Sequence, residues 1–152
     1  MVKLVPAVIA VVLLSGILSG LIVANVRSLY QASSTISSVG TFKAIGIGVY
    51  WDDYSTRSVN ALDWGLLSPG SQKSFTVYVS NEGALPLTLT ISTSNWNPST
   101  ASNYLTLTWN YNGRTLDADT TVPVTITLTV SSGISGINTF NFDITAVGTY
   151  DN

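Results

Sequence analysis

From residue 41 onward, apolar and polar residues alternate with a period of two, the pattern of strands that bury one face. The clearest case is the stretch 75–91, where the alternation runs through 75–80 and resumes in 85–91. Between these runs lies Asn81-Glu82-Gly83, whose Asn and Gly tolerate the positive φ angles that a reversal needs. We therefore expect 75–80 and 85–91 to form one antiparallel pair whose apolar face packs on a second sheet.

Five more segments alternate in the same way and are predicted as strands: 44–51, 59–64, 105–109, 122–130 and 140–146. Gly46 and Gly48 interrupt the first of them and indicate a bulge or a close approach of two backbones. Turn signals follow in later loops, among them Pro69-Gly70 and Asn112-Gly113. About seven short strands without a helical period predict an all-β fold, an antiparallel β-sandwich of the immunoglobulin type.

A different pattern precedes the strands, because residues 4–26 are apolar and carry no charge. As a helix this segment is long enough to cross a bilayer. We therefore expect residues 1–26 to be either a signal peptide that is removed or a membrane anchor that stays. Both alternatives imply export, to the cell surface or the extracellular space. Overlapping pairs of small residues, which let helices pack closely in lipid, are formed by Ser15, Gly16, Ser19 and Gly20.

Residues 27–40 are rich in serine and threonine and are expected to be a tether. Part of this tether, 35–39, is equally compatible with an extended strand. The remaining residues, 41–152, form the predicted sandwich ectodomain, which is large enough to fold without disulfide bonds. The segment 33–45 is a candidate for self-assembly, because an added strand satisfies a row of backbone groups at once. Its candidate residues are Thr35, Ile36, Val39, Phe42 and Ile45.

The composition excludes several classes of function. Histidine and cysteine are both absent, only 9% of the residues are charged, and the net charge is -2. Without histidine, the serines lack the usual base of nucleophilic catalysis, and the commonest metal ligand is missing. The few basic residues are scattered, so no nucleic-acid surface is expected. We therefore predict a protein that is not an enzyme and that carries no cofactor and no metal.

The acidic residues offer one candidate metal site. Asp117 and Asp119 share a loop in a spacing that suits calcium, an ion that prefers oxygen ligands. No stretch of the sequence approaches the twelve-residue calcium loop, however. The simpler interpretation is that these aspartates, like the pair Asp52-Asp53, form turns on a solvated rim.

Four tryptophans invite a carbohydrate-binding interpretation, because aromatic faces stack on sugars. Trp51 and Trp109 are in phase with the apolar positions of their strands, which predicts core packing for both. Trp64 and Trp96 fall at a strand end and in a loop, where stacking on a glycan is possible. The alternative for these two is that they close the ends of the sandwich.

Several turn and strand motifs resemble a pattern of exported prokaryotic sandwich proteins. Leu67-Ser68-Pro69-Gly70 is followed by the strand and turn 75–83, and then by Leu-Pro-Leu-Thr-Leu at 85–89. This order resembles the camelysin/TasA group of biofilm-fibre proteins and the archaeal bundling-pilus subunits. Residues 44–51, together with Trp96-Asn97-Pro98, resemble archaeal surface proteins that have one amino-terminal membrane segment.

The resemblance implies a filament subunit in which a free amino-terminal strand completes the sandwich of the next subunit. The metalloprotease activity ascribed to camelysins is not expected here, because the chain has no histidine and no zinc ligand set. Three hypotheses result. The first is a structural surface protein that forms a homo-oligomer or filament through strand exchange. The second is a membrane-anchored or pilin-like subunit that assembles through its amino-terminal helix. The third is a glycan-binding surface module.

Overall fold

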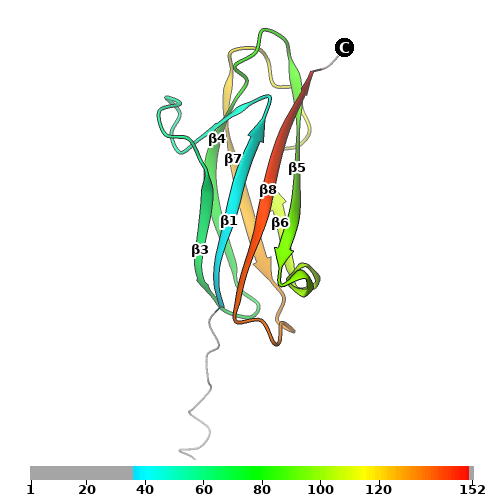
Figure 1. Cartoon of the computed structure of the whole chain (residues 1–152). Coiled ribbons are helices and arrows are strands. Elements are labelled where there is room, and N and C mark those ends of the chain that lie inside the picture. Colours follow the sequence, from blue (N-terminus) through cyan, green and yellow to red (C-terminus); the bar gives the residue numbers. More distant parts are fainter. Residues whose placement is uncertain (1–35, 151–152) are drawn as a thin grey trace, which may run out of the picture. The chain divides into compact units, whose positions relative to one another are not determined.

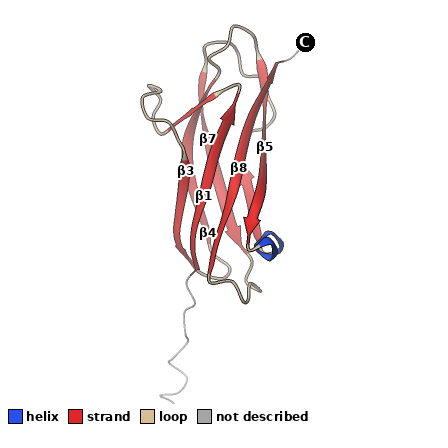
Figure 2. Cartoon of the chain, viewed as in Figure 1, coloured by secondary structure: helices blue, strands red, loops and turns tan. Residues whose placement is uncertain are grey.

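The computed structural model describes residues 36–150, where the alternating segments form eight strands (Figures 1 and 2). In chain order they are β1 (Ile36–Ile45), β2 (Gly48–Tyr50), β3 (Ala61–Leu67), β4 (Gln72–Ser80), β5 (Leu87–Asn97), β6 (Leu105–Trp109), β7 (Thr121–Val130) and β8 (Thr139–Tyr150). A 3-10 helix, η2 (Ser99–Asn103), follows β5. Within the described part of the chain, no helix is long and apolar enough to cross a membrane. The helix expected at 1–26, with its packing residues Ser15, Gly16, Ser19 and Gly20, lies outside the described residues.

The strands form two four-stranded sheets that face each other across one core (Figure 1). The first sheet has the order β3-β1-β8-β5, and the second has the order β2-β4-β7-β6. This architecture confirms the prediction of an all-β fold in two layers. One feature differs from the expected antiparallel arrangement, because β1 and β8 run parallel, whereas the other neighbouring strands pair antiparallel.

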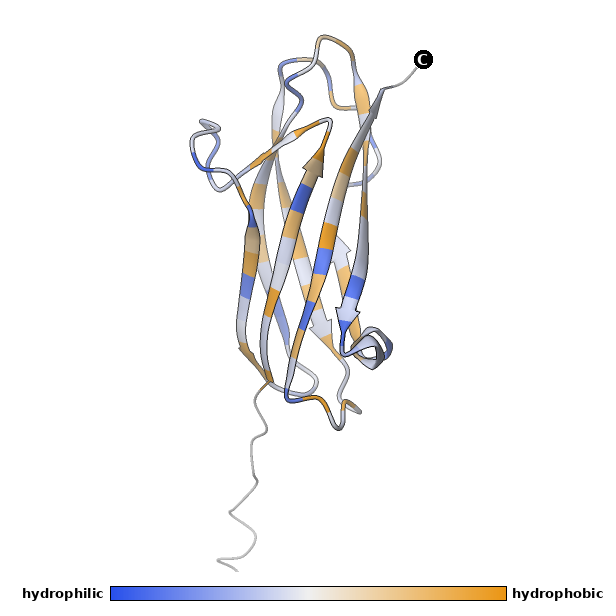
Figure 3. Ribbon diagram, in the orientation of Figure 1, coloured by the Kyte–Doolittle hydropathy of each residue, from blue (hydrophilic) through white to orange (hydrophobic). Residues whose placement is uncertain are grey.

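Side-chain alternation builds the core as the sequence predicts. The inward residues of β7 are buried, and they are Val124, Ile126, Leu128 and Val130. Thr125, Thr127 and Thr129 lie between them on the outer face, where Thr125 and Thr127 bond to hydroxyls of β4. Figure 3 shows apolar and polar bands alternating along the strands. Threonine suits this position because it favours strands and remains polar without adding charge.

The pair expected for 75–80 and 85–91 does not form, because β4 and β5 belong to different sheets. β4 pairs with β2 and β7, whereas β5 pairs with β8. The connection 81–86 therefore crosses from the second sheet to the first and does not close a hairpin. Asn and Gly residues serve a crossing as well as they serve a tight turn, so the sequence pattern does not separate the two.

Asn81 holds this crossing in place. Its side chain is fully buried, and its Nδ2 lies 2.9–3.1 Å from the carbonyl oxygens of Leu85, Leu116 and Asp117. Its Oδ1 accepts a hydrogen bond from the Gly83 N–H at 3.0 Å. One buried amide thus satisfies backbone groups from two separate segments, in a low-dielectric setting where such bonds are strong.

The expected strand 44–51 is divided by a turn at Gly46, whose φ angle is +71°. β1 precedes the turn in the first sheet, and β2 follows it in the second. A side chain at Gly46 would meet the carbonyl oxygen of Gly148 at 3.1 Å. The close backbone approach expected from the glycines is therefore confirmed. The strands also begin before Thr41, because β1 starts at Ile36.

We expect Asn81→Ala to lower the free energy of unfolding by about 2–3 kcal/mol, because it leaves buried carbonyl groups without a donor. Equilibrium urea unfolding, followed by tryptophan fluorescence, measures this loss as a lower midpoint at an unchanged m value. Asn112→Ala, in an exposed turn, is the control and should stay within about 0.5 kcal/mol of the wild type. An equally small change for Asn81→Ala would mean that other contacts hold the crossing.

Candidate functional site

Strand β1 lies in the middle of the first sheet, between β3 and β8 (Figure 1). It pairs with β3 along residues 36–41 and with β8 along residues 37–45. The space between β3 and β8 that β1 fills is termed the β1 slot. Within the described residues, the chain joins β1 to the other strands only at its carboxyl end, through the turn at Gly46. No hairpin connects β1 to either of the strands with which it pairs.

The buried stretch of β1, residues 36–42, carries a large side chain at each end and small residues between them. Ile36 and Phe42 are buried at the ends, with Ser38 and Gly40 buried between them. The fully buried indole of Trp64, on β3, lies against Gly40, where an added Cβ atom would meet Trp64 Nε1 at 3.1 Å. The β1 slot therefore fits a strand whose inner face has small residues at its centre.

Two polar atoms at this inner face are buried without a hydrogen-bond partner in the described part of the chain, Ser38 Oγ and Trp64 Nε1. Most buried polar groups in proteins are satisfied, because an unpaired one costs about 1–3 kcal/mol. The position of the indole is thus set by packing, including contact with Phe75 of the second sheet at a ring-centroid distance of 5.0 Å.

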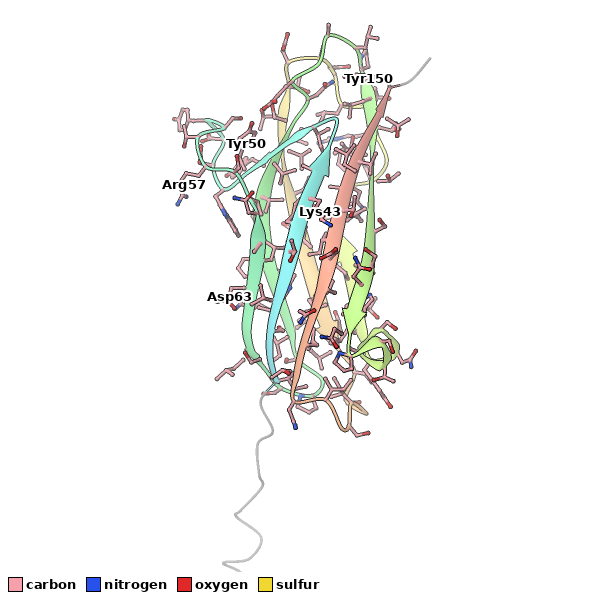
Figure 4. The ribbon with its side chains drawn as sticks, viewed as in Figure 1. Lys43, Tyr50, Arg57, Asp63 and Tyr150 are labelled. Carbon is pink, nitrogen blue, oxygen red and sulfur yellow. The ribbon has the colours of Figure 1, made fainter. Side chains whose placement is uncertain are left out.

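The outer face of β1 is tied to its neighbours by a polar contact. Figure 4 shows Lys43 on this face, and its Nζ donates to Oδ2 of Asp143 on β8 at 3.1 Å. Nδ2 of Asn95, on β5, donates to the same oxygen at 2.8 Å. These bonds favour the charged carboxylate, so the pKa of Asp143 is lowered, first by the Asn95 amide and then by Lys43. One carboxylate therefore joins β1, β8 and β5.

A second polar contact lies where the chain leaves β1. The Tyr50 hydroxyl, on β2, donates to Oε1 of Glu82, and both groups lie over Gly48. The hydrogen bond to Glu82 raises the pKa of Tyr50. A groove beside this contact is lined by residues of β1, β2 and the loop 58–60. The chain thus leaves β1 beside a contact between β2 and the connection 81–86.

The residues predicted for self-assembly divide between the two faces of β1. Ile36 and Phe42 point into the core, whereas Val39 and Ile45 are 46% and 55% exposed. Thr35 lies outside the described residues. The extended conformation considered for 35–39 is confirmed for 36–39, which were also candidates for the tether. The segment is therefore a strand of the sheet in this structure.

The structure separates the two tryptophans considered for glycan binding. Trp64 is fully buried in the interior of β3, so its prediction as a ligand surface is wrong. Trp96 is half-buried and stacks on Phe142, with ring centroids 4.0 Å apart and planes 5° from parallel. One face of this indole is therefore used inside the protein. Trp51 and Trp109 pack against the core, as their spacing predicts.

The aspartates near β2 form a turn, as expected. Asp52 accepts hydrogen bonds from the backbone N–H groups of Thr56 at 3.0 Å and Arg57 at 3.1 Å. The pKa of Asp52 is lowered mainly by the Thr56 N–H. Its neighbour Asp53 is exposed in the same loop. Within residues 36–150, no three acidic, histidine or cysteine side chains gather as a metal site.

Sequence reasoning missed Gly40 and Asp143 as parts of the site. A single glycine in a Ser/Thr-rich run is typical of a linker, and only the spacing of Ile36, Ser38, Gly40 and Phe42 at alternate positions points to a buried face. Asp143 resembles any outward residue of its strand, and its partner Lys43 is 100 residues away in the chain.

No protein-family model matches the chain, and no curated protein matches it. The geometry of the β1 slot is therefore the basis for a functional proposal.

Acid should weaken the contact on the outer face of β1. Because the pKa of Asp143 is lowered in the folded protein, its carboxylate contributes stability that is complete above roughly pH 5 and is lost as the pH falls through the lowered pKa. We expect the fall in the urea midpoint between about pH 7 and about pH 3 to be smaller in Asp143→Asn than in the wild type. Asp53→Asn, which removes an exposed carboxylate from a loop, is the control for the loss of one negative charge. An unchanged pH dependence in Asp143→Asn would contradict this role.

Proposed function

We propose that this protein is a structural subunit of an extracellular filament, assembled when β1 of one subunit fills the β1 slot of the next. The observation that carries the proposal is the position of β1, which is paired along both edges yet joined to the described strands only through the turn at Gly46. A second copy of the chain can supply such a strand without moving any other strand. We also propose that the two sheets form a sandwich of the immunoglobulin type, as expected from the sequence.

An empty β1 slot would be costly. Without β1, the facing backbone groups of β3 and β8 lose their partners. The buried side chains around Gly40 lose their cover as well, and they include Trp64, Phe142 and Ile144. The β1 slot would therefore always be filled, by the subunit's own β1 in a monomer and by a neighbour's β1 in a filament.

The exchange replaces each contact of β1 by the same contact from another chain, so the strand itself favours neither form. The equilibrium between monomer and filament then depends on the protein concentration and on the turn after β1. In the monomer, this turn has a positive φ angle at Gly46. We propose that donation runs from head to tail without closing into a ring, so that it continues into a linear filament. The expected partner is therefore a second copy of this chain.

The location follows from the predicted segment 1–26, which directs export in either of its two expected roles. Removal of this segment would free the chain that leads into β1 at its amino end. A retained segment would hold one subunit of the filament in the membrane. Mass spectrometry of the mature amino terminus distinguishes the two forms, and the proposed strand exchange is compatible with both.

Cysteine pairs placed across the β1 slot should report the exchange directly. Thr41 on β1 and Ala61 on β3 are register partners with exposed side chains. The adjacent Phe42 N–H bonds to the Asn60 carbonyl, so the pair is of the non-hydrogen-bonded type, in which side chains lie close enough for a disulfide. The natural chain has no cysteine, so the introduced thiols are the only ones. Filaments grown from a mixture of Thr41→Cys and Ala61→Cys chains should therefore give disulfide-linked dimers after oxidation.

The matched control replaces Ala61→Cys by Thr90→Cys, an exposed position on β5, which does not neighbour β1. Non-reducing gels should show no dimer from this second mixture. A chain carrying both Thr41→Cys and Ala61→Cys should give covalent ladders from filaments. Filaments in which this double variant yields only monomers with an internal disulfide would rule out strand exchange.

A further inference from the structure

Gly40 lies on the inner face of β1 and has no side chain, and three side chains from other strands approach it. A Cβ atom at Gly40 would lie 3.1 Å from Trp64 Nε1, 3.2 Å from Ile144 Cδ1 and 3.5 Å from Phe142 Cζ. Trp64 belongs to β3, and the other two residues belong to β8, so the contacts come from both walls of the β1 slot. Two of these distances are tighter than nine in ten real Cβ contacts, so any residue other than glycine requires its neighbours to shift by a few tenths of an ångström.

The indole of Trp64 has little room to withdraw. It is fully buried, and the ring of Phe75, from the second sheet, packs against it. Lys73 Nζ donates to the Trp64 carbonyl oxygen at 2.8 Å, which holds the backbone of β3 at the same point. Because Trp64 Nε1 makes no hydrogen bond within the described residues, packing alone sets the position of the ring. A larger residue at Gly40 must therefore displace a ring that is itself enclosed.

The strand fits the β1 slot in a single register, the one that places Gly40 against Trp64. A slip of two residues brings Ser38 or Phe42 to the place of Gly40, and both carry side chains. A slip of one residue turns the strand over, which buries the charged Lys43 and exposes Ile36 and Phe42. Each of these registers meets a steric or an electrostatic cost that the observed register avoids.

From this geometry we propose that Gly40 and Trp64 form a register lock, so that the β1 slot accepts a donor strand only when a glycine lies against the indole. This inference rests on the proposed strand exchange and adds which donors the slot accepts. The accepted donor has a large apolar residue, a small residue, a glycine and an aromatic residue at alternate positions, as in 36–42 of a second copy of this chain. Strands such as β5, with Leu87, Leu89 and Ile91 in succession on one face, are rejected.

Two complementary variants of the full-length chain test the lock. Gly40→Val makes the donor too large, and Trp64→Phe enlarges the slot because the part of the ring with Nε1 is removed. A Gly40→Val subunit accepts a wild-type donor but does not donate to a wild-type slot, so with wild-type chains it is expected only at filament ends. With Trp64→Phe chains it should donate again. Incorporation of labelled Gly40→Val into pelleted filaments should then rise at least about tenfold, the order expected when overpacking is relieved.

Two further chains serve as controls for this comparison. Gly133→Val, in a loop where the nearest atom to an added Cβ lies 3.8 Å away, should co-assemble with the wild type normally. The double variant Gly40→Val/Trp64→Phe carries a matched donor and slot in every subunit, so it should assemble alone. If Gly40→Val loses the native tryptophan emission and fails to fold, Gly40→Ala takes its place in the same comparison.

Equal incorporation of Gly40→Val with wild-type and Trp64→Phe chains would overturn the lock, and so would a folded double variant that does not assemble. The disulfide between Thr41→Cys and Ala61→Cys chains reports strand exchange independently of Gly40. If the disulfide forms but Gly40→Val is incorporated equally with wild-type and Trp64→Phe chains, the register lock is wrong and strand exchange remains supported. If filaments form without the disulfide, strand exchange itself is wrong.

Discussion

Trp64 packs against the backbone of β1, and this contact ties the first sheet to the core. The indole extends from β3 into the interior, where Phe75 of the second sheet contacts it, and Gly40 leaves room for it beneath β1. β1 in turn provides the hydrogen bonds that join β3 to β8. Without this strand the first sheet would be divided, and the core between the two sheets would be open on one side.

If the protein assembles by strand exchange, the contacts of β1 in the β1 slot stabilise both the folded subunit and the filament. A filament would then be as well packed at its junctions as within its subunits, because the junction is the core of the sandwich itself. The bond between Lys43 and Asp143 adds a contact on the solvent side, of the kind that contributes little to affinity but helps to fix orientation. The low charge of the chain is compatible with such an assembly, since neighbouring subunits would repel each other weakly.

Local patterns in the sequence predict most strands and do not predict their pairing. The alternation in β7 is regular, and its buried and outward faces follow directly from it. The crossing at Asn81 depends on contacts with Leu116, 35 residues further on, and an Asn-x-Gly motif alone is equally suited to a hairpin. Trp64 was expected at a strand end, yet β3 continues past Gly65, whose φ angle is +65°, to Leu67. For the site, the sequence located the segment of β1 but not the role of Gly40, because that role depends on side chains from β3 and β8.

In the proposed strand exchange, β1 of one subunit completes the first sheet of another. The most direct measurement is a reconstruction of the filaments by electron cryomicroscopy, at a resolution that follows the main chain through residues 45–48. Strand exchange predicts that the chain runs extended through Gly46 and enters the β1 slot of a neighbouring subunit, with Gly40 against that subunit's Trp64. A chain that turns back at Gly46, leaving every β1 within its own subunit, would contradict it.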